Sequence, residues 1–137
     1  MSDRHILVVE DDPLGLSLLM AKLSANGYQV TGAANVSQAM HATQAQAPDL
    51  MILDLNLLGD DPFAGLTDGY AFLSLLRRNH PDSNFPVIIH TGDPSPDLEA
   101  KAQAHGVYAV VRKGAHTVEL LSIVGLALTE WEIKLAS

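Results

Sequence analysis

Five short runs rich in strand-forming residues, separated by longer amphipathic segments, constrain the fold of this chain more than any other feature of its sequence. The third run, Leu50 to Leu53, is continuously apolar and lies between Asp49 and Asp54, which is typical of a strand buried on both faces of a parallel sheet. The predicted strands are 6–9, 28–31, 50–53, 87–90 and 108–111. Strands that alternate with helices in this way predict an α/β fold, a doubly wound five-stranded parallel sheet with five helices on its two faces.

Capping signals predict where the intervening helices begin. Asp12-Pro13 places an N-cap residue before a proline at the first helical position. Asn35 and Gln38 have the spacing of a capping pair. Residues 55–67 carry neither a helical nor a strand period, so we expect a long loop there. The remaining helices are expected to open at Asp68-Gly69, at Ser95-Pro96 and at His116-Thr117, the last one reaching about Lys134.

Composition limits the class of protein. With 137 residues, a mean hydropathy of +0.15 and 47% hydrophobic residues, the chain is expected to form a single domain over 1–137. The absence of cysteine, of an export signal and of an apolar run of membrane-spanning length predicts a soluble, cytoplasmic protein that does not enter a membrane. A formal net charge of −8 opposes binding to nucleic acid.

Polar residues lie just after four of the predicted strands. Glu10 and Asp11 follow the first, Asp54 the third, Thr91 the fourth and Lys113 the fifth. The carboxyl ends of parallel strands meet at one edge of a sheet, where ligands bind in open α/β folds. Three carboxylates brought that close repel one another unless a hard divalent cation such as Mg²⁺ lies among them. A lysine and a hydroxyl beside such a cation would suit a phosphoryl group.

These residues resemble the receiver domain of two-component response regulators. The matching motifs lie in the family's order: 6–12, 48–55, Asp68-Gly69, Thr91-Gly92 and Lys113. The resemblance implies a flavodoxin-like, receiver-type fold in which Asp54 is the phosphoacceptor. It also implies that Mg²⁺ is held by Glu10, Asp11, Asp54 and the main-chain carbonyl of Asn56, and that Thr91 and Lys113 contact the phosphoryl group.

By the same resemblance, the chain would be a stand-alone receiver and not an enzyme beyond self-phosphorylation and slow autodephosphorylation. Its phosphoryl donor would be a phosphohistidine on a sensor histidine kinase or phosphotransfer protein, and its output would be a downstream protein. A phosphohydrolase of the haloacid-dehalogenase type is disfavoured, because that resemblance would require an acid at the position of Asn56 and a large cap.

Three positions depart from the receiver pattern. The loop after Asp54 is about seven residues longer than usual, so that it is either an inert insertion or a lid. Gly114 replaces the proline that normally follows the lysine. Val110 replaces an aromatic residue, and Tyr108 is expected two residues earlier on the same face of the strand. These departures leave open an alternative, a degenerate receiver that works as a phosphorylation-independent docking module.

The final helix carries more apolar residues than one buried face requires, which leaves two interpretations. One is a partner surface, such as a homodimer through this helix, and the other is crowded burial within the monomer. The apolar residues concerned are Leu120, Leu121, Ile123, Val124, Leu126, Leu128, Trp131, Ile133 and Leu135.

Overall fold

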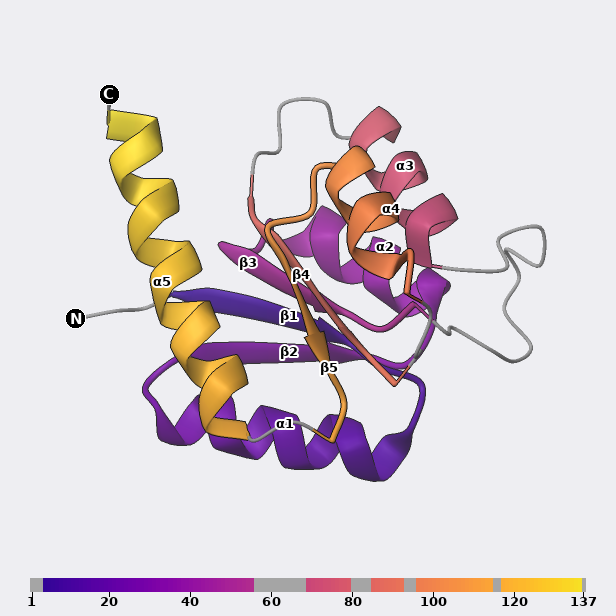
Figure 1. The fold of residues 1–137 in the computed structure, drawn as a ribbon. Helices are drawn as coiled ribbons and strands as arrows, with labels where there is room; N and C mark the ends of the chain where they lie inside the picture. The colour runs from indigo at the N-terminus through magenta and orange to yellow at the C-terminus, as the bar shows by residue number, and fades with distance from the viewer. Residues whose placement is uncertain (1–3, 56–68, 80–84, 93–95, 115–116, 137) are drawn as a thin grey trace.

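The computed structural model describes residues 4–55, 69–79, 85–92, 96–114 and 117–136 as an α/β protein (Figure 1). Five parallel strands form one sheet in the order β2-β1-β3-β4-β5, which confirms the predicted fold class. The strands are β1 (His5–Val9), β2 (Gln29–Ala33), β3 (Leu50–Leu53), β4 (Val87–Thr91) and β5 (Ala109–Arg112). The helices are α1 (Pro13–Ala25), α2 (Val36–Ala45), α3 (Gly69–Asn79), α4 (Leu98–Ala104) and α5 (Thr117–Ala136).

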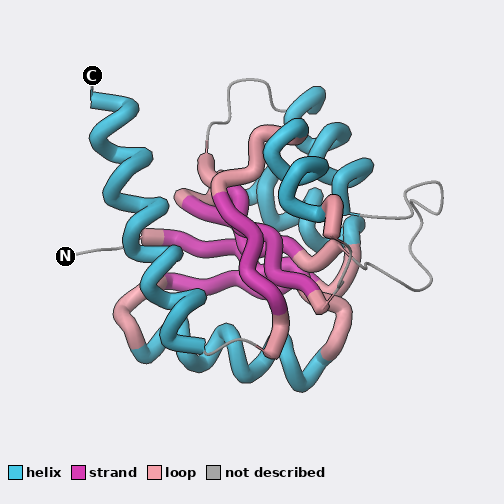
Figure 2. Tube along the Cα trace, in the orientation of Figure 1, coloured by secondary structure: helices cyan, strands magenta, loops and turns pink. Residues whose placement is uncertain are grey.

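The sheet separates two apolar cores, and helices cover both of its faces (Figure 2). On one face, Phe72 of α3 packs with side chains of α2 and α4. On the other face, Leu23 of α1 packs with Val124 of α5. Every residue of β1 and β3 is buried, because both strands lie inside the sheet and have helices above and below them. The central strands therefore form a rigid support for whatever follows them in the chain.

The predicted caps of the first two helices are confirmed. The Asp12 carboxylate accepts a hydrogen bond from the Gly15 amide at 3.1 Å. The Asn35 side chain accepts from the Gln38 amide at 2.8 Å, and the Gln38 side chain accepts from the Ala34 amide. The fourth helix begins later than expected, at Leu98, and its N-cap residue Asp97 makes no side-chain capping bond. Asp68, expected to cap α3, lies outside the described residues, and so does the expected loop over 55–67 apart from Leu55.

Tyr108 corrects one expectation about the fifth strand. Val110 packs against the core beneath α3 and α4, whereas Tyr108 packs against the opposite core. The Tyr108 hydroxyl donates to a carboxylate oxygen of Glu130 on α5 at 2.7 Å. The prediction that the two residues share a face is wrong, because Tyr108 precedes β5 and the alternation of a strand does not extend to it. No side chain on this strand therefore stands in for an aromatic residue at 110.

The last helix buries part of its apolar surface and exposes another part. Leu120, Val124 and Leu128 are buried against the sheet, whereas Leu126 and Ile133 are 56% and 65% exposed. Two leucines of α1, Leu14 and Leu18, are also exposed, which the sequence reading did not anticipate. In the described part of the chain, no helix combines the length and the apolar character needed to cross a membrane.

Candidate functional site

The carboxyl edge of the sheet gathers three acidic side chains. Glu10 follows β1 and Asp54 follows β3, and the main-chain amide of Asp54 donates to the carbonyl of Val9 at 3.0 Å. The hydrogen-bond ladder between β1 and β3 thus continues one residue beyond β3, to Asp54. Glu10 and Asp54 are buried, and Asp11 is half-buried. One carboxylate oxygen from each of the three lies within 4.8 Å of the others.

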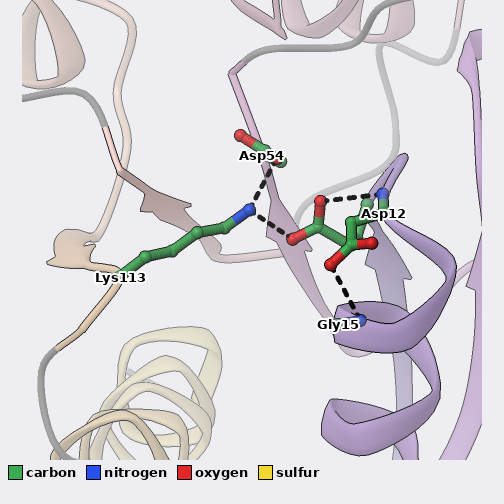
Figure 3. A network of polar contacts seen from close by, with 5 residues as sticks. Asp12, Gly15, Asp54 and Lys113 are labelled. Carbon is green, nitrogen blue, oxygen red and sulfur yellow. Dashed lines mark hydrogen bonds and ion pairs between the residues drawn. The ribbon is translucent and has the colours of Figure 1, made fainter.

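Lys113 reaches this cluster from β5 and contacts two of the acids (Figure 3). Its Nζ lies 2.5 Å from Glu10 Oε1 and 2.9 Å from Asp54 Oδ2. The second Glu10 oxygen accepts from the amide of Asp12 at 3.2 Å, at the start of α1. The lysine is thus the cation that joins the ends of β1, β3 and β5.

Burial and the closeness of the charged groups shift the pKa values of Glu10 and Lys113. Burial, followed by the interaction with Asp54, raises the pKa of Glu10 from 4.5 to about 7, although Lys113 acts in the opposite direction. For Lys113, burial lowers the pKa, but its hydrogen bonds with Glu10 and Asp54 outweigh burial, so that the net shift is upward. One lysine therefore does not fully offset the acidic charge.

The donor set fits a hard divalent cation. Carboxylate oxygens are the ligands that Mg²⁺ prefers, and the three oxygens within 4.8 Å of one another can be shared by a single ion. Burial and the neighbouring Asp54 raise the pKa of Glu10, and a cation shared by these oxygens would favour the ionised carboxylates. Asn56, the fourth expected ligand, lies outside the described residues.

Thr91 lies at the same edge, on the strand next to β3. It is fully buried, and its main-chain carbonyl accepts from the Lys113 amide at 2.7 Å. The structure therefore brings Glu10, Asp11, Asp54 and Lys113 into one cluster, with Thr91 bonded to the lysine through the backbone. Beside it on β4, burial and then the charge of Lys113 lower the pKa of the half-buried His90.

The sequence reading missed an ion pair beside the lysine. Arg112, the last residue of β5, donates through Nη2 to both carboxylate oxygens of Glu99 on α4, at 2.9 and 3.1 Å. This pair lowers the pKa of Glu99. The two residues lie in different elements, so no helical or strand spacing could have related them.

Three comparisons with known proteins bear on this site. The response regulator receiver domain model matches residues 6–125. The nitrogen assimilation regulatory protein NtrX of Azorhizobium caulinodans is 28% identical over 129 residues, which cover 94% of this chain and 27% of that protein. The chain thus spans about a quarter of that curated relative.

Solved structures show the same fold. NtrX from Brucella abortus, in complex with ATP, has a TM-score of 0.84 and 27% identity, covering 97% of this chain and 28% of that one. A CheY-like receiver domain protein from Methanospirillum hungatei has a TM-score of 0.83 at 23% identity, covering 97% of this chain and 99% of that one.

Proteins of this family are phosphoacceptor domains of two-component signalling. Receiver domains generally bind Mg²⁺ and interact with histidine kinases and with downstream effectors. The fold, the acidic cluster and the match over residues 6–125 lead to one conclusion. The chain belongs to the response regulator receiver domain family.

Proposed function

We propose that this chain is a phosphorylation-controlled signalling module whose phosphoacceptor is Asp54. The donor is a phosphohistidine on a sensor histidine kinase or phosphotransfer protein, and the phosphorylated state changes binding to a downstream protein. The observation that carries the proposal is the contact of Lys113 Nζ with Asp54 Oδ2 at 2.9 Å, inside a cluster of three acids. A buried carboxylate that faces both a lysine and a potential metal site is suited to accept a phosphoryl group.

In the proposed reaction, a carboxylate oxygen of Asp54 forms the new bond to phosphorus. The bond from phosphorus to the donor imidazole nitrogen breaks, and its electron pair returns to the imidazole. Lys113 stabilises charge on the phosphoryl oxygens, and Thr91 donates its hydroxyl to one of them. Glu10, Asp11, Asp54 and the Asn56 carbonyl would hold Mg²⁺, which supplies further charge neutralisation when bound.

The test is intact-mass measurement after incubation with acetyl phosphate and Mg²⁺. We expect one adduct of about 80 Da on the wild-type chain, since a phosphoryl group is added to Asp54. Asp54→Asn should carry no adduct. Asp12→Asn is the matched control, because Asp12 lies beside the cluster but caps α1, and it should be labelled like the wild type. An adduct that persists in Asp54→Asn would refute the assignment, including any that lay on Asp60 or Asp61.

Val110 and Gly114 support a second candidate, a degenerate receiver that docks to a partner without phosphorylation. Val110 is only partly buried where receivers carry an aromatic switch residue, and Gly114 has a φ of +92°. In that case the wild-type chain would show no adduct under conditions that label a known receiver. Neither candidate makes the chain an enzyme beyond self-phosphorylation and slow autodephosphorylation, so steady turnover of phosphomonoesters would contradict both.

A further inference from the structure

Lys113 stands on the least supported strand of the sheet. β5 is the last strand in the sheet order, so that in the described part of the chain only β4 pairs with it. The next residue, Gly114, has a φ of +92° and nothing within 4 Å of the position that a Cβ would take. A glycine in open space restricts the backbone very little. Receivers usually have a proline here, which would restrict it strongly.

Transfer to Asp54 nevertheless requires the lysine to be placed accurately. Its ammonium group lies at the end of a flexible four-carbon side chain and must contact both Glu10 and Asp54. On the β4 side, the Lys113 amide is fixed by its bond to the Thr91 carbonyl at 2.7 Å. On the other side of β5, where no described strand pairs with it, a second contact is needed to hold the end of the strand.

Glu99 provides that support through Arg112. Both carboxylate oxygens of Glu99 accept from Arg112 Nη2, at 2.9 and 3.1 Å, one residue before Lys113. Arg112 is also the β-sheet partner of Thr91. The pair therefore ties the end of β5, at the level of the phosphoryl-binding residues, to the first turn of α4.

The helix that carries Glu99 is itself held at both ends by α3. Arg77 donates to the main-chain carbonyls of His105 and Gly106 at the end of α4. The Tyr70 hydroxyl donates to the Leu98 carbonyl at 3.4 Å, and the Tyr70 ring stacks on His105 with a centroid distance of 4.6 Å. Between α4 and β5 lies a cleft of about 270 Å³, lined by Ala102, Ala109 and Val110 among others.

We infer that Glu99 and Arg112 are positioning residues for phosphoryl transfer: their ion pair fixes the end of β5 and thereby the approach of Lys113 to Asp54. The ion pair restrains the backbone at the end of β5, as a conformationally restricted residue at position 114 would. This inference rests on the proposed function, in which Lys113 contacts the phosphoryl group.

The experiment compares phosphorylation rates with acetyl phosphate in the wild type, Glu99→Gln and Asp97→Asn. Asp97 is the matched control, since it lies in the same region and pairs with Lys101 of α4 at 3.4 Å without contacting β5. We expect the rate at saturating donor to fall by about threefold in Glu99→Gln, a modest factor because the pair is partly exposed. The half-saturating Mg²⁺ concentration should stay unchanged, because no metal ligand is altered. Asp97→Asn should keep the wild-type rate.

A charge exchange separates positioning from a general loss of structure. Glu99→Arg combined with Arg112→Glu restores opposite charges at the two positions and should recover at least part of the rate that each single change removes. An unchanged or faster rate in Glu99→Gln would overturn the inference, as would a double variant as slow as both singles. The proposed function fails separately, if the wild-type chain itself takes no phosphoryl group.

Discussion

The two sides of the candidate site are held in place by different kinds of interaction. Glu10 and Asp54 follow β1 and β3, whose residues are all buried and have paired strands on both sides. Lys113 follows β5, an edge strand with one buried residue out of four. The acidic side is therefore fixed by close packing, and the lysine side by polar contacts that can be rearranged at small free-energy cost.

This difference suits a switch. Under the proposed function, Asp54 must keep its place beside Glu10 and Asp11, whereas Lys113 must be able to shift toward the oxygens of a phosphoryl group. The lysine side is also where the chain departs from the receiver pattern, at Val110 and Gly114.

The largest difference in stability should come from truncating one strand residue on the acidic side of the site and one on the lysine side. Ile52→Ala, in central β3, removes a side chain that is 1% exposed, and it should lower the free energy of unfolding by about 3–5 kcal/mol. Val110→Ala, in edge β5, should lower it by about 1–2 kcal/mol, because Val110 is half-buried beside a cleft. Urea denaturation measures both. Equal losses would mean that the lysine side is packed as tightly as the centre.

The acidic side should make the metal-free protein less stable as pH rises. A carboxyl whose folded pKa is raised, here Glu10 from 4.5 to about 7, binds more protons in the folded state than in the unfolded state across this interval. The free energy of unfolding should therefore fall by about 2–3 kcal/mol between pH 4.5 and 7, and then level off. Thermal or urea unfolding in a chelator would measure it.

Glu10→Gln is the control for that slope, since it cannot ionise, and its stability should change much less over the same pH interval. Saturating Mg²⁺ should also reduce the slope in the wild type, because a bound cation favours the ionised carboxylates. If the free energy of unfolding fell with pH just as steeply in Glu10→Gln, the pH dependence would come from groups other than Glu10.

Replacing Gly106 by alanine should cost more stability than replacing Gly114, although both lie on the lysine side of the site. Gly106 and Gly114 have φ values of +72° and +92°, so an alanine at either should cost about 1 kcal/mol. At Gly106 a Cβ would also lie 2.9 Å from Arg77 Nη1, and moving that guanidinium would weaken its bonds to α4. Gly106→Ala should thus cost about 1 kcal/mol more than Gly114→Ala. In an Arg77→Ala background, this excess should disappear.

The smallest effect on folding is expected at the exposed face of α5. Leu126 is 56% exposed, and Leu126→Ser should change the free energy of unfolding by less than about 0.5 kcal/mol.

The same variant tests the predicted homodimer through α5. Sedimentation with beryllofluoride and Mg²⁺ should show a mass increase in the wild type that Leu126→Ser weakens. If the wild type stays monomeric with the mimic, the prediction of phosphorylation-driven self-association is wrong, and the exposed face of α5 would instead serve to dock another protein.

The sequence predicted the strands more reliably than the element ends. Leu50 to Leu53 was identifiable because an uninterrupted apolar run between two aspartates matches a strand buried on both faces. The sequence predicts too early a start for α4, because Pro96 favours a helix start but the Asp97 carbonyl accepts the first hydrogen bond of the helix, from the Lys101 amide. The alternation of strand residues predicts the wrong face for Tyr108, because this residue precedes β5 and packs against the core beneath α1 and α5.

By itself, the sequence determined the α/β alternation and the acids and lysine at the strand ends, because strand periodicity and position relative to a strand end are local properties. The tertiary structure alone decided how these residues are supported. It paired Arg112 with Glu99, joined α3 to α4 through Arg77, and left a cleft beside Val110. Such contacts join side chains of separate elements, and their geometry depends on how helices settle on the sheet, which no spacing along the chain specifies.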